Sequence, residues 1–144
     1  RDVRAVLRLA LLTALVIATT TYAAVALAAE PLALAFNRDN DPQLTALAVD
    51  GMRVYFLGYF FAGANIVAAA FFSAVEKPAY GLAISIVRGL PAMLAFAAVL
   101  AALFGMAGVW ATFPAAEAAT FALTAVLLVR FVHGPRRRDR EVVA

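Results

Sequence analysis

Long apolar runs separated by short polar segments dominate the pattern of this chain. Leu9–Ala29 has no charged residue, Val54–Val75 forms a second run, and no charge interrupts Gly89–Ala116. The two glycines of "FGMAG", Phe104–Gly108, predict a tight turn that separates a fourth run, which extends to Val132. A membrane-spanning helix needs about 20 apolar residues to cross a hydrocarbon core of about 30 Å. The pattern therefore predicts an all-α membrane protein with four transmembrane helices.

The expected helix boundaries follow from turn signals between these runs. Asp41 followed by Pro42 favours a helix start, because Asp accepts hydrogen bonds from first-turn amides and Pro fits the first turn. We expect a four-helix region over residues 1–132, with helices near residues 5–36, 42–76, 79–104 and 107–132. Residues 133–144 would form a basic cytoplasmic tail. A membrane β-barrel would instead need strands of alternating polarity about 10 residues long, and the chain shows no such pattern.

Composition supports the membrane interpretation. The chain is 65% hydrophobic and 15% charged, with a mean hydropathy of +0.91, whereas a soluble domain has about 45–50% apolar and about 25% charged residues. It has no cysteine, which excludes disulfides and thiolate metal sites. The first methionine is Met52, so we expect a processed product or a piece of a longer protein.

Basic residues predict the orientation in the membrane, because Lys and Arg are retained on the cytoplasmic side. Nine of the twelve basic residues lie on the same predicted side of the membrane: Arg1, Arg4, Arg8, Lys77, Arg130, Arg136, Arg137, Arg138 and Arg140. Arg38 and Arg53 fall on the other side. We therefore expect both termini in the cytoplasm. The tail "RRRDR" is interpreted as a topology and lipid anchor rather than a nucleic-acid site.

Three polar side chains within the predicted spans are candidates for a transport path. Glu117 lies about 15 Å into its helix at 1.5 Å per residue, so we expect it to be protonated, paired or facing water. Arg88 either extends toward the cytoplasmic surface or faces an internal cavity. Asn65 fits a helix–helix hydrogen bond better than a transport role. We expect Arg88 and Glu117 not to pair, because a turn near residues 106–107 would separate them by about 11 Å along the helix axes.

Small residues and prolines predict close packing and bends. Gly81, Ser85 and Gly89 recur every four residues, a spacing that lets a neighbouring helix approach closely. Pro91 and Pro114 each remove a backbone hydrogen bond and favour a bend. The chain has no phosphate-binding loop, no cluster of metal-ligating side chains and no nucleophile beside a base. We therefore expect no enzymatic activity, no metal site and no cofactor.

Three segments carry a family resemblance through the order of their features: "MRVYFLGYFFAGANIVAAAFFSAVEKP", "SIVRGLP" and "GMAGVWATFPAAEAATF". The features are Arg53, Tyr55, Gly63, Asn65, Lys77-Pro78, Arg88, Gly105, Gly108-Val109-Trp110, Pro114 and Glu117. In this order and spacing they resemble the last helices of multidrug and toxin extrusion (MATE) transporters. The resemblance covers essentially the whole chain, and the first helix is its least distinctive part.

The resemblance implies a fold and a function. Such transporters have twelve helices in two six-helix lobes, and they exchange H⁺ or Na⁺ for cationic or amphipathic drugs. This chain would form helices nine to twelve, with the remaining helices of a parent transporter, the lipid bilayer and a small-molecule drug as its partners, in a bacterial inner membrane. The family's C-lobe cation site uses acidic residues on helices seven and ten. The helix-ten equivalent here offers Asn65 instead, which puts coupling through a C-lobe sodium site in doubt.

Two alternatives stay open. One is a self-contained four-helix transporter that works as a dimer, like the small multidrug resistance proteins, which carry an essential glutamate in their first helix. Here the first helix has no acid until Glu30, at its outer end and directly before Pro31, which speaks against that function. The other is a non-transporting membrane subunit or a gene remnant.

Overall fold

Four apolar helical segments account for nearly all of the described chain. The computed structural model describes residues 3–133 and divides them into α1 (Val3–Phe36), α2 (Pro42–Tyr55), α3 (Gly58–Ala74), α4 (Pro78–Arg88), α5 (Leu90–Phe104) and α6 (Met106–His133). The segments long and apolar enough to cross a membrane are Val3–Phe36, Pro42–Ala74, Pro78–Phe104 and Met106–Val132. This confirms the predicted all-α membrane protein with four transmembrane helices. The basic tail predicted beyond His133 lies outside the described residues.

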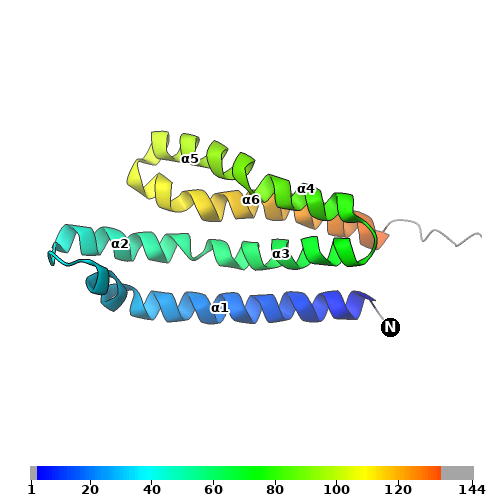
Figure 1. Cartoon of the computed structure of the whole chain (residues 1–144), viewed down its shortest axis with the longest axis horizontal. Helices are drawn as coiled ribbons and strands as arrows, with labels where there is room; N and C mark the ends of the chain where they lie inside the picture. Colours follow the sequence, from blue (N-terminus) through cyan, green and yellow to red (C-terminus); the bar gives the residue numbers. More distant parts are fainter. Residues whose placement is uncertain (1–2, 134–144) are drawn as a thin grey trace, which may run out of the picture.

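The four segments run side by side in alternating directions (Figure 1). α3 occupies the centre and packs against α1, α4 and α6, while α6 also contacts α2 and α5. The start of α1, the α3–α4 connection and the end of α6 lie at the same end of the bundle (Figure 1). There the Arg4 guanidinium donates to the Val132 carbonyl oxygen at 3.1 Å. The predicted basic positions Arg4, Lys77 and Arg130 therefore belong to one end of the molecule.

Polar side chains close the opposite end of the bundle. The Asp41 carboxylate accepts hydrogen bonds from the main-chain nitrogens of Gln43 at 2.8 Å and Leu44 at 3.5 Å, which caps α2. The buried Asn37 amide donates to the Asp41 carbonyl oxygen at 2.7 Å and to the Thr45 hydroxyl at 2.9 Å. The start of the second span thus follows the capping signal of its sequence.

Most large apolar side chains point away from the bundle rather than into it. α5 has no buried residue, and Leu27 and Leu103 are 87% and 68% exposed. In a membrane-spanning bundle such outward-facing side chains meet lipid tails, which are as apolar as they are. The apolar core of Ala68, Phe72, Ile84 and Leu127 is correspondingly small and joins α3, α4 and α6. Two other interactions must therefore hold the helices together: close packing at small residues, and polar contacts between helices.

Two glycines determine how α5 meets α6. Gly105 connects them with a φ of 58°, a left-handed conformation that favours glycine. Three residues later, Gly108 approaches the Leu100 carbonyl oxygen so closely that a Cβ atom would overlap it. The two helices are thus in near backbone contact directly after the turn.

Gly108→Ala should therefore destabilise the protein by about 1–3 kcal/mol, the usual cost of overpacking. The added methyl would meet main-chain atoms of α5, which cannot rotate aside as a flexible side chain can. Gly63→Ala is a matched control, because its Cβ would lie 3.4 Å from the Ala14 Cβ, near an ordinary contact distance. Free energies of unfolding in the same detergent would be compared. Equal stability of the two variants would contradict the close approach at Gly108.

Reporter fusions test the predicted orientation. A reporter after Asp41 and another after Ala144 should respond from opposite sides of the membrane, because an odd number of spans separates these positions. An enzyme reporter active only outside the cytoplasm should be active after Asp41 and inactive after Ala144. Activity at both positions, or at neither, would contradict four spans with cytoplasmic ends.

Candidate transport site

A buried carboxylate on α6 forms the centre of the candidate site. Glu117 is 2% exposed, and each of its carboxylate oxygens accepts hydrogen bonds from a different helix. Oε1 accepts from Nε and Nη2 of Arg88 on α4, at 3.2 and 3.0 Å. Oε2 accepts from Nδ2 of Asn65 on α3, at 2.8 Å. The arrangement satisfies an ionised carboxylate in a place where an unpaired charge would be costly.

Asn65 extends this network to a second position on α6. Its side chain is completely buried. Nδ2 donates both to the Glu117 carboxylate and to the Glu117 main-chain oxygen, the latter at 3.0 Å. Oδ1 accepts from the Thr124 hydroxyl at 2.8 Å. Asn65 therefore joins α3 to two turns of α6, as expected for a helix–helix hydrogen bond, and it does so through the candidate carboxylate.

The expectation that Arg88 and Glu117 do not pair is wrong, because they form a salt bridge of 3.0 Å. The error lies in the position of the turn. α5 ends at Phe104 and α6 begins at Met106, and Gly108 packs against Leu100. Counting nine residues away from this contact, forward along α6 and backward along α5, places Glu117 level with Pro91 rather than with Ala95 or Phe96.

From that level Arg88 is only three residues away, about 4.5 Å at 1.5 Å per residue. A guanidinium on its flexible side chain spans this distance. Arg88 thus lies against Glu117 with 27% of its side chain still exposed.

The break between α4 and α5 places Arg88 at the end of a helical segment. Gly89 leaves the helical conformation, with φ −76° and ψ −134°, and its amide bonds to the Ile86 carbonyl oxygen. The predicted bend residue Pro91 falls in the first turn of α5. Pro114 lies inside α6, one turn before Glu117, where its missing N–H leaves the preceding turn with one hydrogen bond fewer.

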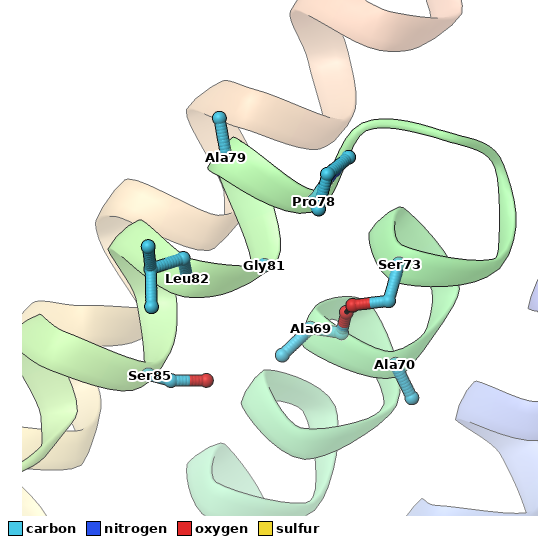
Figure 2. A pocket seen from close by; sticks show the side chains of 8 residues that line it. All are labelled: Ala69, Ala70, Ser73, Pro78, Ala79, Gly81, Leu82 and Ser85. Carbon is cyan, nitrogen blue, oxygen red and sulfur yellow. Dashed lines mark hydrogen bonds between the residues drawn. The ribbon is translucent and has the colours of Figure 1, made fainter.

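The Gly81–Ser85–Gly89 stripe divides into two environments. A Cβ on Gly81 would lie 2.7 Å from the Ala69 carbonyl oxygen and 3.0 Å from the Ser73 hydroxyl oxygen, so α4 approaches α3 closely there. Beside this contact an open groove of about 580 Å³ is lined by residues of both helices, and Figure 2 shows Ser85 pointing from α4 toward α3. Gly89 belongs to the helix break instead. At Gly81 the stripe therefore allows close packing of α4 on α3, and at Gly89 it forms the break between α4 and α5.

Sequence reasoning missed Thr124, which the structure joins to the site. Glu117, Thr120 and Thr124 are spaced by three and four residues, so they share one face of α6, and the structure buries all three. This spacing was a usable signal. It does not reveal which threonine bonds across helices, because both could bond within α6.

The groups that contact the Glu117 carboxylate are hydrogen-bond donors rather than metal ligands. Arg88 and Asn65 present N–H groups to the carboxylate, whereas a metal ion needs oxygen or nitrogen lone pairs as ligands. Within residues 3–133 no group of three His, Cys, Asp or Glu side chains could hold a metal ion. In the observed arrangement a cation could reach the carboxylate only by displacing Arg88 or Asn65.

Comparison with protein families finds that the MatE family profile matches residues 1–99. This match includes Asn65 and Arg88 and ends before Glu117 and Thr124. Comparisons with curated proteins and with solved structures find no match.

The salt bridge makes a testable prediction about stability. Arg88→Ala should destabilise the protein by about 3 kcal/mol. This value is at the lower end of the cost of breaking a buried ion pair, because Arg88 is partly exposed. The cost arises from leaving the Glu117 charge without its partner. Adding Glu117→Gln removes that charge, so the double variant should be more stable than Arg88→Ala alone. Free energies of unfolding of the two single variants and the double variant in one detergent would test this. A double variant no more stable than Arg88→Ala would contradict the pairing.

Proposed function

The chain belongs to the MATE family of membrane transporters, and from that premise we propose that it forms helices nine to twelve of a secondary antiporter. The antiporter would export cationic or amphipathic drugs in exchange for H⁺ or Na⁺. Alternating access requires two lobes that rock around a site at their interface. The four spans make up two-thirds of a six-helix lobe, so this chain is not transport-competent alone and works with the remaining helices of a parent transporter.

The observation that carries this proposal is the pairing of Glu117 with Arg88 and Asn65 inside the bundle. Glu117 lies eleven residues after the start of α6, about 16 Å deep at 1.5 Å per residue and therefore near the membrane midplane. Ionisable side chains at that depth usually face the interior of a bundle and mark ion or proton pathways. The chain brings its three transport-path candidates, Glu117, Arg88 and Asn65, into one connected network.

Of the two coupling ions, the geometry favours H⁺. Protonation of Glu117 would remove the charge that holds Arg88, and the new O–H group would need one acceptor, such as the Asn65 Oδ1 after rotation of the amide. Sodium would need several oxygen ligands in place of the N–H donors that now contact the carboxylate. We therefore assign Glu117 the role of a proton-binding carboxylate in the exchange.

We place both termini in the cytoplasm of a bacterial cell. The basis is the excess of basic residues at one end of the bundle, where the start of α1 and the end of α6 meet through Arg4 and Val132. The small four-helix dimer is disfavoured, because Glu30, the acid that its mechanism would need on the first helix, is exposed near the end of α1.

The test replaces Glu117 by Gln in the complete parent transporter. Gln keeps the shape and hydrogen-bonding capacity of Glu but cannot ionise. Drug efflux should fall to roughly a tenth or less, on the order expected when an essential proton-carrying group is lost. Insertion and expression should be nearly unchanged. Glu30→Gln is the matched control, because it makes the same change at an exposed position and should leave efflux unaltered.

Drug accumulation would be compared in cells that make equal amounts of each protein. Full activity of Glu117→Gln would assign Glu117 a structural role and withdraw it from transport. Efflux by the isolated 144 residues would contradict the proposed fragment and support the four-helix dimer. A complete parent protein that exports no drug would support the non-transporting subunit.

A further inference from the structure

The Thr124 hydroxyl differs from those of six other threonines in its choice of acceptor. Threonines in helices commonly donate to the carbonyl oxygen four residues earlier. Six of them do so here: Thr13, Thr19, Thr20, Thr45, Thr112 and Thr120. Thr124 instead donates across the bundle to Oδ1 of Asn65, at 2.8 Å. It is completely buried, as is Thr120 one turn earlier, so burial alone does not explain the difference.

This hydrogen bond favours one orientation of the Asn65 amide relative to Glu117. A hydroxyl that donates to Oδ1 keeps the amide oxygen on the Thr124 side. The amide nitrogen is then left to face the Glu117 carboxylate and its main-chain oxygen. The main-chain oxygen can only accept, so it favours the same orientation. Donation to Oδ1 also polarises the amide and strengthens its N–H groups as donors.

The orientation of Asn65 affects the two charge states of Glu117 differently. With the N–H groups facing it, the ionised carboxylate has a donor at each oxygen. A protonated carboxyl would need an acceptor for its O–H, which Asn65 could supply only by turning its Oδ1 toward Glu117. That rotation would break the hydrogen bond from Thr124 to Oδ1 and would leave the Glu117 main-chain oxygen without its Asn65 donor.

We infer that Thr124 is a positioning residue that favours the ionised form of Glu117 through Asn65. The inference rests on the proposed role of Glu117 as a proton-binding carboxylate. Its geometric basis is a directed chain in which Thr124 donates to Asn65 and Asn65 donates to Glu117. The hydroxyl of Thr124 thereby acts on the carboxylate through Asn65, although it does not touch the carboxylate.

Few other charged or titratable groups face Glu117 from the neighbouring helices. Arg88 from α4 contacts it directly. Tyr55 and Tyr59 pack against Phe113, one turn before Glu117. α5 contributes no ionisable side chain. The test therefore leaves Arg88 and both tyrosines unchanged, so that only the Thr124 hydroxyl varies.

The experiment is a pH titration of Glu117 by infrared difference spectroscopy in the complete transporter reconstituted in lipid. The carboxylic-acid C=O band that disappears in Glu117→Gln identifies the group. Thr124→Val keeps the side-chain shape but removes the donor, so protonation should occur at higher pH, by about 0.5–1 unit, on the order of one neutral hydrogen bond. Thr124→Ser should restore the parent midpoint.

Thr120→Val is the matched control, because it removes an equally buried hydroxyl that bonds only to Ala116 of its own helix. An unchanged midpoint in Thr124→Val, or an equal shift in Thr120→Val, would overturn the inference. If Thr124→Val is not recovered as folded protein, Thr124→Ala removes the same donor and has a smaller side chain to accommodate. Efflux is scored separately: normal transport by Glu117→Gln defeats the proposed function, whereas an infrared shift in Thr124→Val still supports the positioning role.

Discussion

A charge buried inside a membrane-spanning bundle constrains this structure more than any apolar contact does. Lipid tails cover the outer faces of the helices as well as other helices would, so apolar burial contributes little to specificity. Glu117 is different, because neither lipid nor an apolar side chain can satisfy its carboxylate. Its oxygens find partners only where α3 presents Asn65 and α4 presents Arg88. The three helices must therefore meet in one register, and a displacement by one turn would leave a buried charge unpaired.

Three glycines make that register available. The turn at Gly105 and the contact between Gly108 and Leu100 bring α6 back along α5 without an offset. The break at Gly89 ends α4 directly after Arg88, so the arginine belongs to a segment that is not continuous with α5. These features explain why helix-weakening residues occur in an otherwise apolar stretch. They allow a charged side chain to meet its partner at mid-depth.

The sequence predicted the spans and the polar candidates, but not the contacts among them. Span prediction needs only apolar length, which is a property summed over about 20 residues. Pairing depends on register, and in antiparallel helices a turn misplaced by one residue shifts the facing positions by two. The expected turn near 106–107 put Glu117 level with Ala95 or Phe96, whereas the packing of Gly108 on Leu100 puts it level with Pro91. Thr124 was missed for a related reason. Its hydroxyl can donate to the Thr120 carbonyl oxygen or to the Asn65 Oδ1, and which of the two it reaches depends on the position of α3.

The three side chains of the network differ in exposure, which bears on the proposed proton exchange at Glu117. Glu117 and Asn65 are 2% and 0% exposed, and both are held by donors on helices that form the small core. Arg88 is the network member that retains contact with the surroundings, at 27% exposure, and it ends the short segment before the break at Gly89. The guanidinium is therefore the partner of the carboxylate that lies nearest to the surroundings of the bundle. Neutralising Glu117 weakens the attraction that keeps Arg88 in this position, so in the proposed exchange proton uptake and the position of α4 depend on the same ion pair.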